Sequence, residues 1–431
     1  GVSGQVSMNE VKGGATATVD KATITAETGN VSISATEDST LNAVIDSVTK
    51  SDGGSTFGGG ASLAASGVVA TNLVNSSAEA TLSNSSVTTQ DAVTDSGKVA
   101  IEAKNTSEIN ANIKNSVESS GSSVGVTLAY NTVGYESQNV LFNTVDALLG
   151  TDINNSQPVN VHASIQDSEV QSAGALSVSA NSEVTIDAQI ETSATTVDVS
   201  ADDSDTVSVG GNITMNKTAV RTAATIEEAS EITVQNDDLR VQAKDTSTIT
   251  SNVQAPVLAA SVGDKSTAVA VGLSTARNNI DSDVDASIRS SSGSDKNSVS
   301  VTNGSVLVEA EQASTIESTA AASAIGISAG ASSSKAFSGG GAIANNTIAG
   351  STKASLERSD ITESDSVSLS AKDAATINAT VESAAVAVAV GSGTTPAIAI
   401  GISVATNEIG NDDDSRNPVE VKAYTKDSNI E

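Results

Sequence analysis

A beat of the form apolar-x-apolar-x-Ala recurs six times along this chain, and it constrains the fold more than any other feature. Each beat is followed six residues after its Ala by an apolar residue and eight residues after it by a small one. The copies are VSISATEDSTLNA (31–43), VAIEAKNTSEINA (99–111), LSVSANSEVTIDA (176–188), LRVQAKDTSTITS (239–251), VLVEAEQASTIES (306–318) and VSLSAKDAATINA (367–379). Alternation with period two predicts strands with one buried and one wet face.

Two further anchors recur in a fixed order between these beats. The first pairs a Gly with an Asn six residues later, at Gly125 and Asn131, Gly210 and Asn216, Gly272 and Asn278, Gly340 and Asn346, and Gly401 and Asn407. A sixth copy has Ser66 in the Gly position, with Gly67 beside it and Asn72 in register, and the opening copy at Gly4 and Asn9 is one residue short. Because Gly tolerates positive φ and Asn bonds nearby backbone, these anchors are expected to be structural residues at coil corners.

The second anchor starts Ala-x-apolar and gives the period. Its alanines are Ala17, Ala80, Ala163, Ala224, Ala286, Ala354 and Ala423. Their spacing indicates a repeat of about 62 residues with insertions. The longest interval, between Ala80 and Ala163, contains YESQNVLFNTVDALLGTDINNSQPV (135–159), which predicts a protruding loop.

The repeats favour an all-β fold, a right-handed parallel β-helix. Within one repeat the anchors begin at Gly210, Ala224 and Leu239, and the next repeat begins at Gly272. This spacing predicts three or four coils per repeat and about 20 to 28 coils altogether. Residues 1–431 would then form a single continuous solenoid of about six repeats, with partial units at both ends. The alternative is a string of small β-sandwiches, which would need bulky residues between sheets and linkers between domains.

Composition agrees with a thin core. Only six residues are aromatic, so Ala, Val, Ile, Ser and Thr must fill the interior. Few aromatics and a net charge of −31 are also typical of disorder, but β-branched residues are abundant and only four residues are Pro. The charge argues against nucleic acid and anionic membranes as partners, and no apolar run is long enough to insert into a membrane.

Catalytic constellations are hard to find. The chain has no Cys and a single His, His162, which alternation places outward in VNVHAS as a solvated strand residue. Cysteine–histidine catalysis is therefore excluded, and a zinc site is not expected. A β-helix enzyme acting on carbohydrate would need clustered charges and aromatics in a groove, which the sequence does not reveal, so no enzyme activity is expected.

Two runs of carboxylates are the candidate metal residues. Asp281, Asp283 and Asp285 alternate in DSDVD and would share one strand face, and Asp412, Asp413 and Asp414 are consecutive in an expected turn. Oxygen-rich clusters suit Ca²⁺. Both runs lack the glycine pattern of known calcium loops, so an acidic solvated face is the simpler interpretation, and calcium is the one cofactor considered.

The Gly and Asn phrases, the V-x-I-x-A beats and small-residue runs such as AVAVAVGSGTTPAIAIGISVATNEI (385–409) resemble the repetitive stalks of filamentous haemagglutinin-like bacterial adhesins. The resemblance covers nearly the whole chain. It implies export to the cell surface or beyond, a β-helical shaft, and a role in attachment to host, cell or matrix surfaces. The alternative is a module that binds carbohydrate, ice or calcium through one face.

Both ends of the chain fall inside the repeat pattern. Residues 1–11 match the first anchor, and residues 411–431 continue another unit without a visible cap. An uncapped coil exposes unpaired backbone groups that recruit further strands. We therefore expect end-to-end association with neighbouring repeats or other copies.

Overall fold

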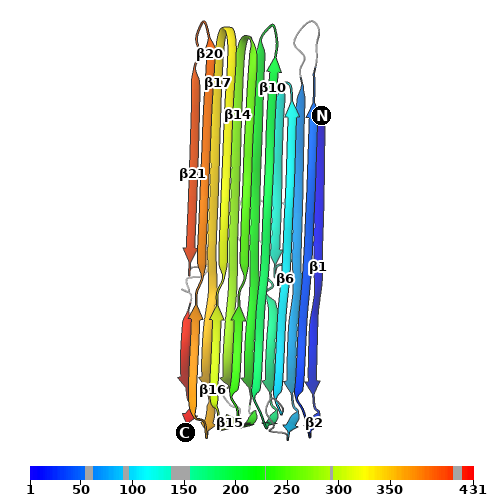
Figure 1. Ribbon diagram of the computed structural model, residues 1–431, viewed down its shortest axis with the longest axis vertical. Helices are drawn as coiled ribbons and strands as arrows, with labels where there is room; N and C mark the ends of the chain where they lie inside the picture. Colours follow the sequence, from blue (N-terminus) through cyan, green and yellow to red (C-terminus); the bar gives the residue numbers. More distant parts are fainter. Residues whose placement is uncertain (54–61, 91–96, 137–155, 229, 292–294, 411–419) are drawn as a thin grey trace.

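The chain forms a flattened β-solenoid with two long walls (Figure 1). The computed structural model describes residues 1–431 except 54–61, 91–96, 137–155, 229, 292–294 and 411–419. All regular elements in the described part are strands, and the named strands pair in parallel. The all-β, parallel solenoid predicted from the repeats is confirmed at this level.

One coil consists of a strand that descends in Figure 1, a short strand at the lower end, an ascending strand and a bend at the upper end. The descending wall contains β1 (Val2–Asp20), β4 (Leu63–Ser83), β7 (Ser122–Val133), β8 (Val159–Gln166), β11 (Ser204–Glu227), the second halves of β14 (Thr248–Arg289) and β17 (Thr315–Glu357), β21 (Ala397–Ile409) and β22 (Val421–Lys426).

The ascending wall faces it. This wall contains β3 (Val31–Ser51), β6 (Val99–Ser119), β10 (Leu176–Val199), β13 (Leu239–Asp245), the first halves of β14 and β17, β16 (Ser305–Gln312), β19 (Ser366–Asp373) and β20 (Thr376–Gly391). The first half of β14 pairs with β10 and its second half with β11, so β14 itself passes over the upper bend.

A separate seven-stranded sheet closes the lower end, with one short strand from each coil. Its members are β2 (Thr23–Ala26), β5 (Ser86–Thr89), β9 (Glu169–Ser172), β12 (Glu231–Gln235), β15 (Asn297–Thr302), β18 (Ser359–Thr362) and β23 (Asn429–Ile430). Left-handed residues mark the corner before most of these strands, namely Lys21, Asn84, Asp167, Glu228, Arg358 and Asp427.

The predicted number of coils is wrong. Residues that pair across neighbouring strands lie one whole repeat apart, as in Val2 with Ala65 and Ile186 with Ile249. Each repeat therefore makes one coil, and the seven short strands indicate seven coils rather than 20 to 28. The first and second anchors of one repeat, as at Gly210 and Ala224, lie in a single long strand with no turn between them. The repeats pair with one another, as a solenoid requires, and do not fold as separate sandwiches.

The strands are unusually long, which explains why the predicted number of coils is too high. β10 and β11 have 24 residues each, so each is about 80 Å long at about 3.3 Å per residue. Seven coils at about 4.8 Å stack to only about 30 Å. The longest axis of the molecule therefore runs along the strands (Figure 1).

The repeated Gly and Asn residues do not lie at corners. Gly125, Gly210, Gly272 and their equivalents lie inside strands and face the opposite wall. A Cβ at Gly272 would lie 2.8 Å from the Ala255 carbonyl oxygen and 2.9 Å from that of Ser323, so close approach of the walls requires glycine there. Gly67 and its partner Gly4 are exceptions, because Ser66 occupies the equivalent inward position in its coil and both glycines face outward.

The repeated asparagines form a ladder through all seven coils. Each side-chain amide donates to the Oδ1 atom of the next Asn, at 2.7 or 2.8 Å, in the order Asn9, Asn72, Asn131, Asn216, Asn278, Asn346 and Asn407. Most of these side chains are buried. The ladder satisfies polar groups inside the solenoid and matches each coil to the next in register.

The interior differs between the two ends of the strands. The lower half holds a large cluster of Ile, Leu, Val and Ala side chains, including Ile109 and Ile316, which occupy the same inward row as predicted. The upper half contains smaller clusters, rich in Ala. Buried hydroxyls join the walls near the upper end, as where Ser123 and Ser208 both lie within 3 Å of Thr196 Oγ1.

Most of the predicted loop lies outside the described residues. The chain leaves the descending wall at Tyr135, which forms an isolated bridge with Ser156 where the chain returns. Among the described residues, no helix has the length and apolarity needed to span a membrane.

Candidate functional site

A row of charged and polar side chains crosses the outer face of the descending wall in its lower half. Each member is the residue before a second-anchor alanine, so alternation points it outward. Parallel pairing aligns the row as Thr16, Glu79, His162, Ala223, Asp285, Lys353 and Lys422. A second row lies two residues earlier in each strand and includes Asn160, Arg221, Asp283 and Ser351.

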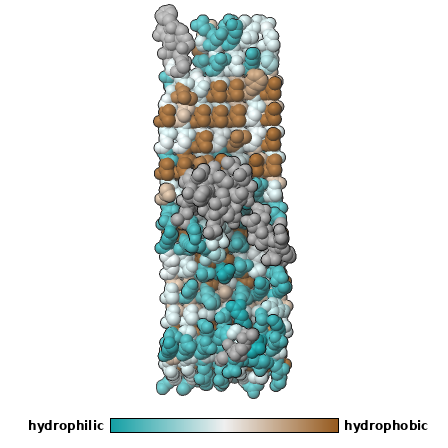
Figure 2. All heavy atoms as spheres, turned by 180° about the vertical axis from the view of Figure 1, so that it is seen from behind, coloured by the Kyte–Doolittle hydropathy of each residue, from teal (hydrophilic) through white to brown (hydrophobic). Residues whose placement is uncertain are grey.

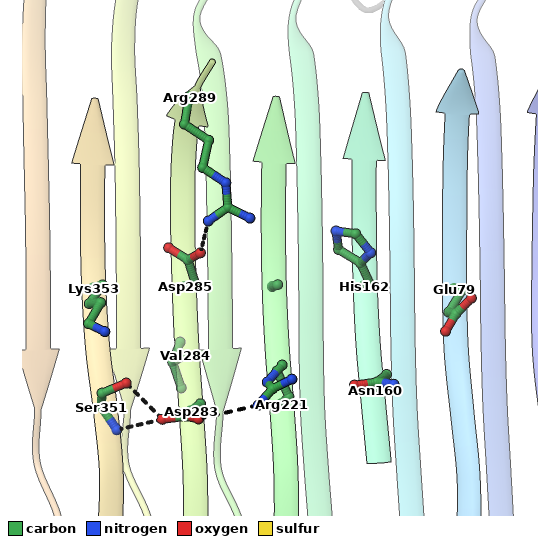
Figure 3. A pocket seen from close by; sticks show the side chains of 11 residues that line it. Glu79, Asn160, His162, Arg221, Asp283, Val284, Asp285, Arg289, Ser351 and Lys353 are labelled. Carbon is green, nitrogen blue, oxygen red and sulfur yellow. Dashed lines mark hydrogen bonds and ion pairs between the residues drawn. The ribbon is translucent and has the colours of Figure 1, made fainter. Parts of the chain in front are cut away.

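A hollow opens at Ala223, the smallest member of the first row. It has a volume of about 390 Å³, and its lining includes His162 on one side and Asp285 and Lys353 on the other (Figure 3). The methyl group of Ala223 leaves space that larger neighbours enclose. A hollow of this size is within the range of small-molecule sites.

Two of the predicted calcium ligands line this hollow, but basic side chains and hydroxyls already bind them. Asp283 accepts hydrogen bonds from the backbone N–H and the hydroxyl of Ser351, at 3.0 and 2.7 Å, and lies 3.9 Å from Arg221. Asp285 forms an ion pair of 2.6 Å with Arg289 (Figure 3). The shared face predicted for these aspartates is confirmed, and it is a mixed-charge surface rather than a purely acidic one.

Arg289 links this cluster to a third position. Its second guanidinium nitrogen lies 2.6 Å from Glu227 in the neighbouring coil. Burial raises the pKa of Asp285, and the nearby Arg289 opposes that shift. The guanidinium between two carboxylates holds Asp285 and this edge of the hollow in one arrangement.

His162 faces outward, as predicted, but it is only partly exposed and lines the hollow rather than standing free in solvent. Its Nε2 atom lies 3.2 Å from the hydroxyl of Thr225. Burial lowers the pKa of His162, although Glu227 and Glu79 oppose the shift. This shift favours the neutral imidazole, which offers one donor and one acceptor.

The polar groups that line the hollow can form hydrogen bonds with a ligand. The Thr225 hydroxyl, 3.2 Å from the imidazole, is fully buried beneath the hollow's lining. The other polar lining groups are carboxylates, guanidinium groups, an amide, an ammonium and a hydroxyl, beside the apolar side chains of Ala223 and Val284. Such groups form directional hydrogen bonds with a polar ligand.

The remaining candidate metal residues stay apart from this hollow. Asp281 lies on the same outward face of β14 but does not line it, and Asp412, Asp413 and Asp414 are outside the described residues. No group of three or more His, Cys, Asp or Glu side chains suited to a metal ion occurs in the part of the chain that the structure describes.

Sequence reasoning did not find Glu79, Arg221, Arg289 or Lys353. A signal was present, because aligning the repeats on the second anchor brings Glu79, His162, Asp285 and Lys353 into one column. That column becomes a physical row only if each repeat makes one coil. Because the predicted coil number is wrong, the sequence alone does not place these residues side by side or predict the hollow. Comparisons with protein families, curated proteins and solved structures found no match to this chain.

Proposed function

We propose that this chain is a non-enzymatic structural shaft, a segment of a large surface fibre of the filamentous haemagglutinin-like kind, at the cell surface or outside the cell. The observation that carries the proposal is the asparagine ladder, in which one hydrogen bond of 2.7 or 2.8 Å repeats through seven coils. The same contact can form at every added coil, so it suits an array that is extended coil by coil rather than a site for a local reaction.

Solenoid physics favours the same role. Each coil contacts mainly its neighbours, so stability is a sum of similar interfaces and the array can be extended by adding repeats. We infer the right-handed form, because crossovers between parallel strands are almost always right-handed. The expected partners are other sets of coils, with host, cell or matrix surfaces as the site of attachment.

The end coils supply a means of axial association. Val31 in β3 and Val367 in β19 face the interior but are only partly buried, because each has a paired coil on one side alone. Among the residues that the structure describes, no strand pairs with the other edge of β3 or β19. Such an edge pairs with a further strand, and head-to-tail contacts that do not close produce a filament.

Electron microscopy and light scattering over a concentration series test this role. We expect filaments that grow along the stacking direction, perpendicular to the strands. Val367→Lys places a charge inside the exposed end coil and should block growth, whereas Ser368→Lys, on the outer face of the same strand, should not. A wild-type chain that stays monomeric at high concentration would contradict end-to-end assembly.

A second candidate function is a carbohydrate-binding module, which the hollow over Ala223 favours. Asp283, Arg221, Asn160 and Ser351 offer the donors and acceptors that sugar hydroxyls require. Ala223→Arg would fill the hollow while leaving the inward neighbours unchanged, so it should abolish any binding detected on a glycan array. If the wild-type chain binds no glycan, this candidate is rejected and the shaft proposal is unaffected.

A further inference from the structure

Apolar side chains cover the upper outer face of the descending wall in four rows (Figure 2). Parallel pairing fixes their membership. The rows are Leu63, Ser122, Val207, Val269, Phe337 and Ile398; Val2, Ala65, Val124, Val209, Val271, Gly339 and Ile400; Gly4, Gly67, Val126, Gly211, Leu273, Gly341 and Ile402; and Val6, Val69, Leu128, Ile213, Thr275, Ile343 and Val404. We call these four rows the apolar face.

The apolar face is open to solvent well inside the array, and not only at its edges. Val126 is 40% exposed and Leu273 is 52% exposed, although both belong to coils with neighbours on each side. Rows about 6.6 Å apart and coils about 4.8 Å apart give a surface of about 800 Å². That exceeds the largest apolar patch of a typical monomer, about 300–600 Å².

Glycines on this face lack an internal reason. A Cβ at Gly67, Gly211 or Gly339 would meet no atom within 4 Å, and none of the three has a positive φ. This contrasts with inward Gly272, where a Cβ would collide with backbone of the facing wall. Glycine weakens a strand interior and often marks close approach by another backbone or a ligand. The open glycines therefore indicate an external surface that packs against this wall.

The third row alternates between large and absent side chains from the second coil to the seventh. Its order is Gly67, Val126, Gly211, Leu273, Gly341 and Ile402. Consider a second copy of the chain related by a two-fold axis that runs parallel to the strands between the fourth and fifth coils. This axis would place Gly211 of one copy opposite Leu273 of the other. Each remaining large side chain of the row, a knob, would likewise lie opposite a glycine, a dimple. Gly341 differs from the open glycines, because a Cβ there would lie 2.8 Å from Leu273 Cδ2 of the same chain, so the Leu273 side chain already lies partly over this position.

We propose that the apolar face binds the apolar face of a second copy of this chain, so that two solenoids pair side by side. About 800 Å² per partner is the usual size of a stable protein interface. The alternation is complementary to itself under a two-fold axis, which is the symmetry of most homodimers. A lipid surface is fluid and gains nothing from dimples at fixed spacing. This pairing joins the descending walls of two copies and is independent of the proposed end-to-end contact.

Sedimentation velocity over a micromolar concentration series tests the pairing. We expect a dimer in the wild-type chain, and Leu273→Lys should raise its Kd at least about tenfold. The control is Ile327→Lys on the ascending wall, where Ile327 is 41% exposed, belongs to a coil with neighbours on each side and lies outside the apolar face. Both changes reduce the net negative charge equally, so general repulsion cannot explain a difference between them.

Filling a dimple with a larger apolar side chain tests whether association depends on shape complementarity or on apolar surface alone. Gly211→Leu has open space in a single copy, so the fold should be retained, yet the dimer should weaken because the knob opposite loses its place. If Gly211→Leu strengthens association, or if the wild-type chain does not associate, the proposal is overturned. Association that survives these changes but is lost with Val367→Lys would show an end-to-end contact instead and would also overturn it.

Cross-linking tests the arrangement directly, because the chain has no cysteine of its own. A chain with both Val126→Cys and Gly341→Cys should form a disulfide-linked dimer on mild oxidation, since these positions are three coils apart in one copy and opposite each other across the axis. A chain with Gly67→Cys and Gly341→Cys should not. Equal cross-linking of both chains would overturn the two-fold pairing.

Discussion

The lower and upper halves of the descending wall distribute their apolar residues in opposite ways. In the lower half, Ile, Leu and Val face a wide interior and charged groups such as Asp285 and Arg289 face solvent. In the upper half, Gly, Ala, Ser and Thr line a narrow interior, and Val, Ile and Leu cover the outside. Figure 2 shows the change along one face.

The contrast shows that wall spacing determines which residues can be buried. Where inward glycines bring the walls together, large side chains have no space inside, and hydrogen bonds such as those of Ser123, Thr196 and Ser208 hold the walls instead. The lower half is therefore stabilised mainly by apolar burial, and the upper half by backbone ladders and buried hydroxyls.

The largest effect is expected in the lower core. Ile109 is fully buried in a row with Leu41, Ile186, Ile249 and Ile316. Ile109→Asp would bury a carboxyl group without a partner, so the free energy of unfolding should fall by about 4 kcal/mol or more. Chemical denaturation measures this loss.

Glu108→Lys is the matched control, because Glu108 is the next residue and faces outward. It should change the free energy of unfolding by less than about 0.5 kcal/mol. Equal tolerance of both changes would contradict the strand register.

In the upper half, inward Gly272 and outward Gly211 test whether the interior is narrow; Gly211 follows Gly210, the register partner of Gly272. Gly272→Ala places a Cβ against the Ala255 and Ser323 carbonyl oxygens, and backbone cannot move aside easily, so we expect a loss of about 1–3 kcal/mol. Gly211→Ala points outward into open space and should be neutral or stabilising by up to about 1 kcal/mol. Thermal melting of both variants gives the comparison, and equal losses would refute the narrow interior.

Sequence patterns predict the local structure of this chain well. Period-two alternation assigns inward Ile109 and outward Glu108, His162, Asp283 and Asp285 correctly, because strand geometry alone decides which face a side chain occupies. The scarcity of aromatic residues predicts a thin interior, because small side chains cannot fill a wide one. The upper half of the molecule shows such a thin interior.

The same patterns cannot reveal which strands pair. Alternation looks alike in one long strand and in several short ones, and only the pairing of Glu79 with His162 or of Gly211 with Leu273 shows that a repeat is one coil. The hollow at Ala223 and the apolar face both arise from that long-range register. The role of a glycine is also ambiguous in the sequence, because inward Gly272 inside a strand cannot be distinguished there from a glycine at a corner.

Removing one member of the asparagine ladder tests whether neighbouring coils are joined by polar side-chain contacts as well as by apolar ones. Asn216→Ala would leave the Asn131 amide without its acceptor and Asn278 Oδ1 without its donor. Unpaired buried groups cost about 1–3 kcal/mol, so Tm should fall measurably. Asn345→Ala, on the outer face, is the control and should have little effect. Equal Tm values would show that the ladder adds no stability.

The smallest expected effect concerns a carboxyl group buried in the lower half, and it depends on pH. Asp245 is fully buried and accepts hydrogen bonds from Ser247 Oγ at 2.8 Å and Ser314 Oγ at 3.2 Å. Burial raises its pKa above the ordinary value of 3.8, although the hydroxyls oppose this shift. The folded chain therefore holds this proton more tightly than the unfolded chain, and stability contributed by the protonated group is lost as pH rises from about 4 through the folded pKa. Asp245→Asn keeps the shape without the ionisation. Its free energy of unfolding relative to wild type should increase between pH 4 and neutrality, whereas Asp205→Asn on the exposed face controls for net charge. A difference between Asp245→Asn and wild type that is constant with pH would show that Asp245 does not titrate between the folded and unfolded states.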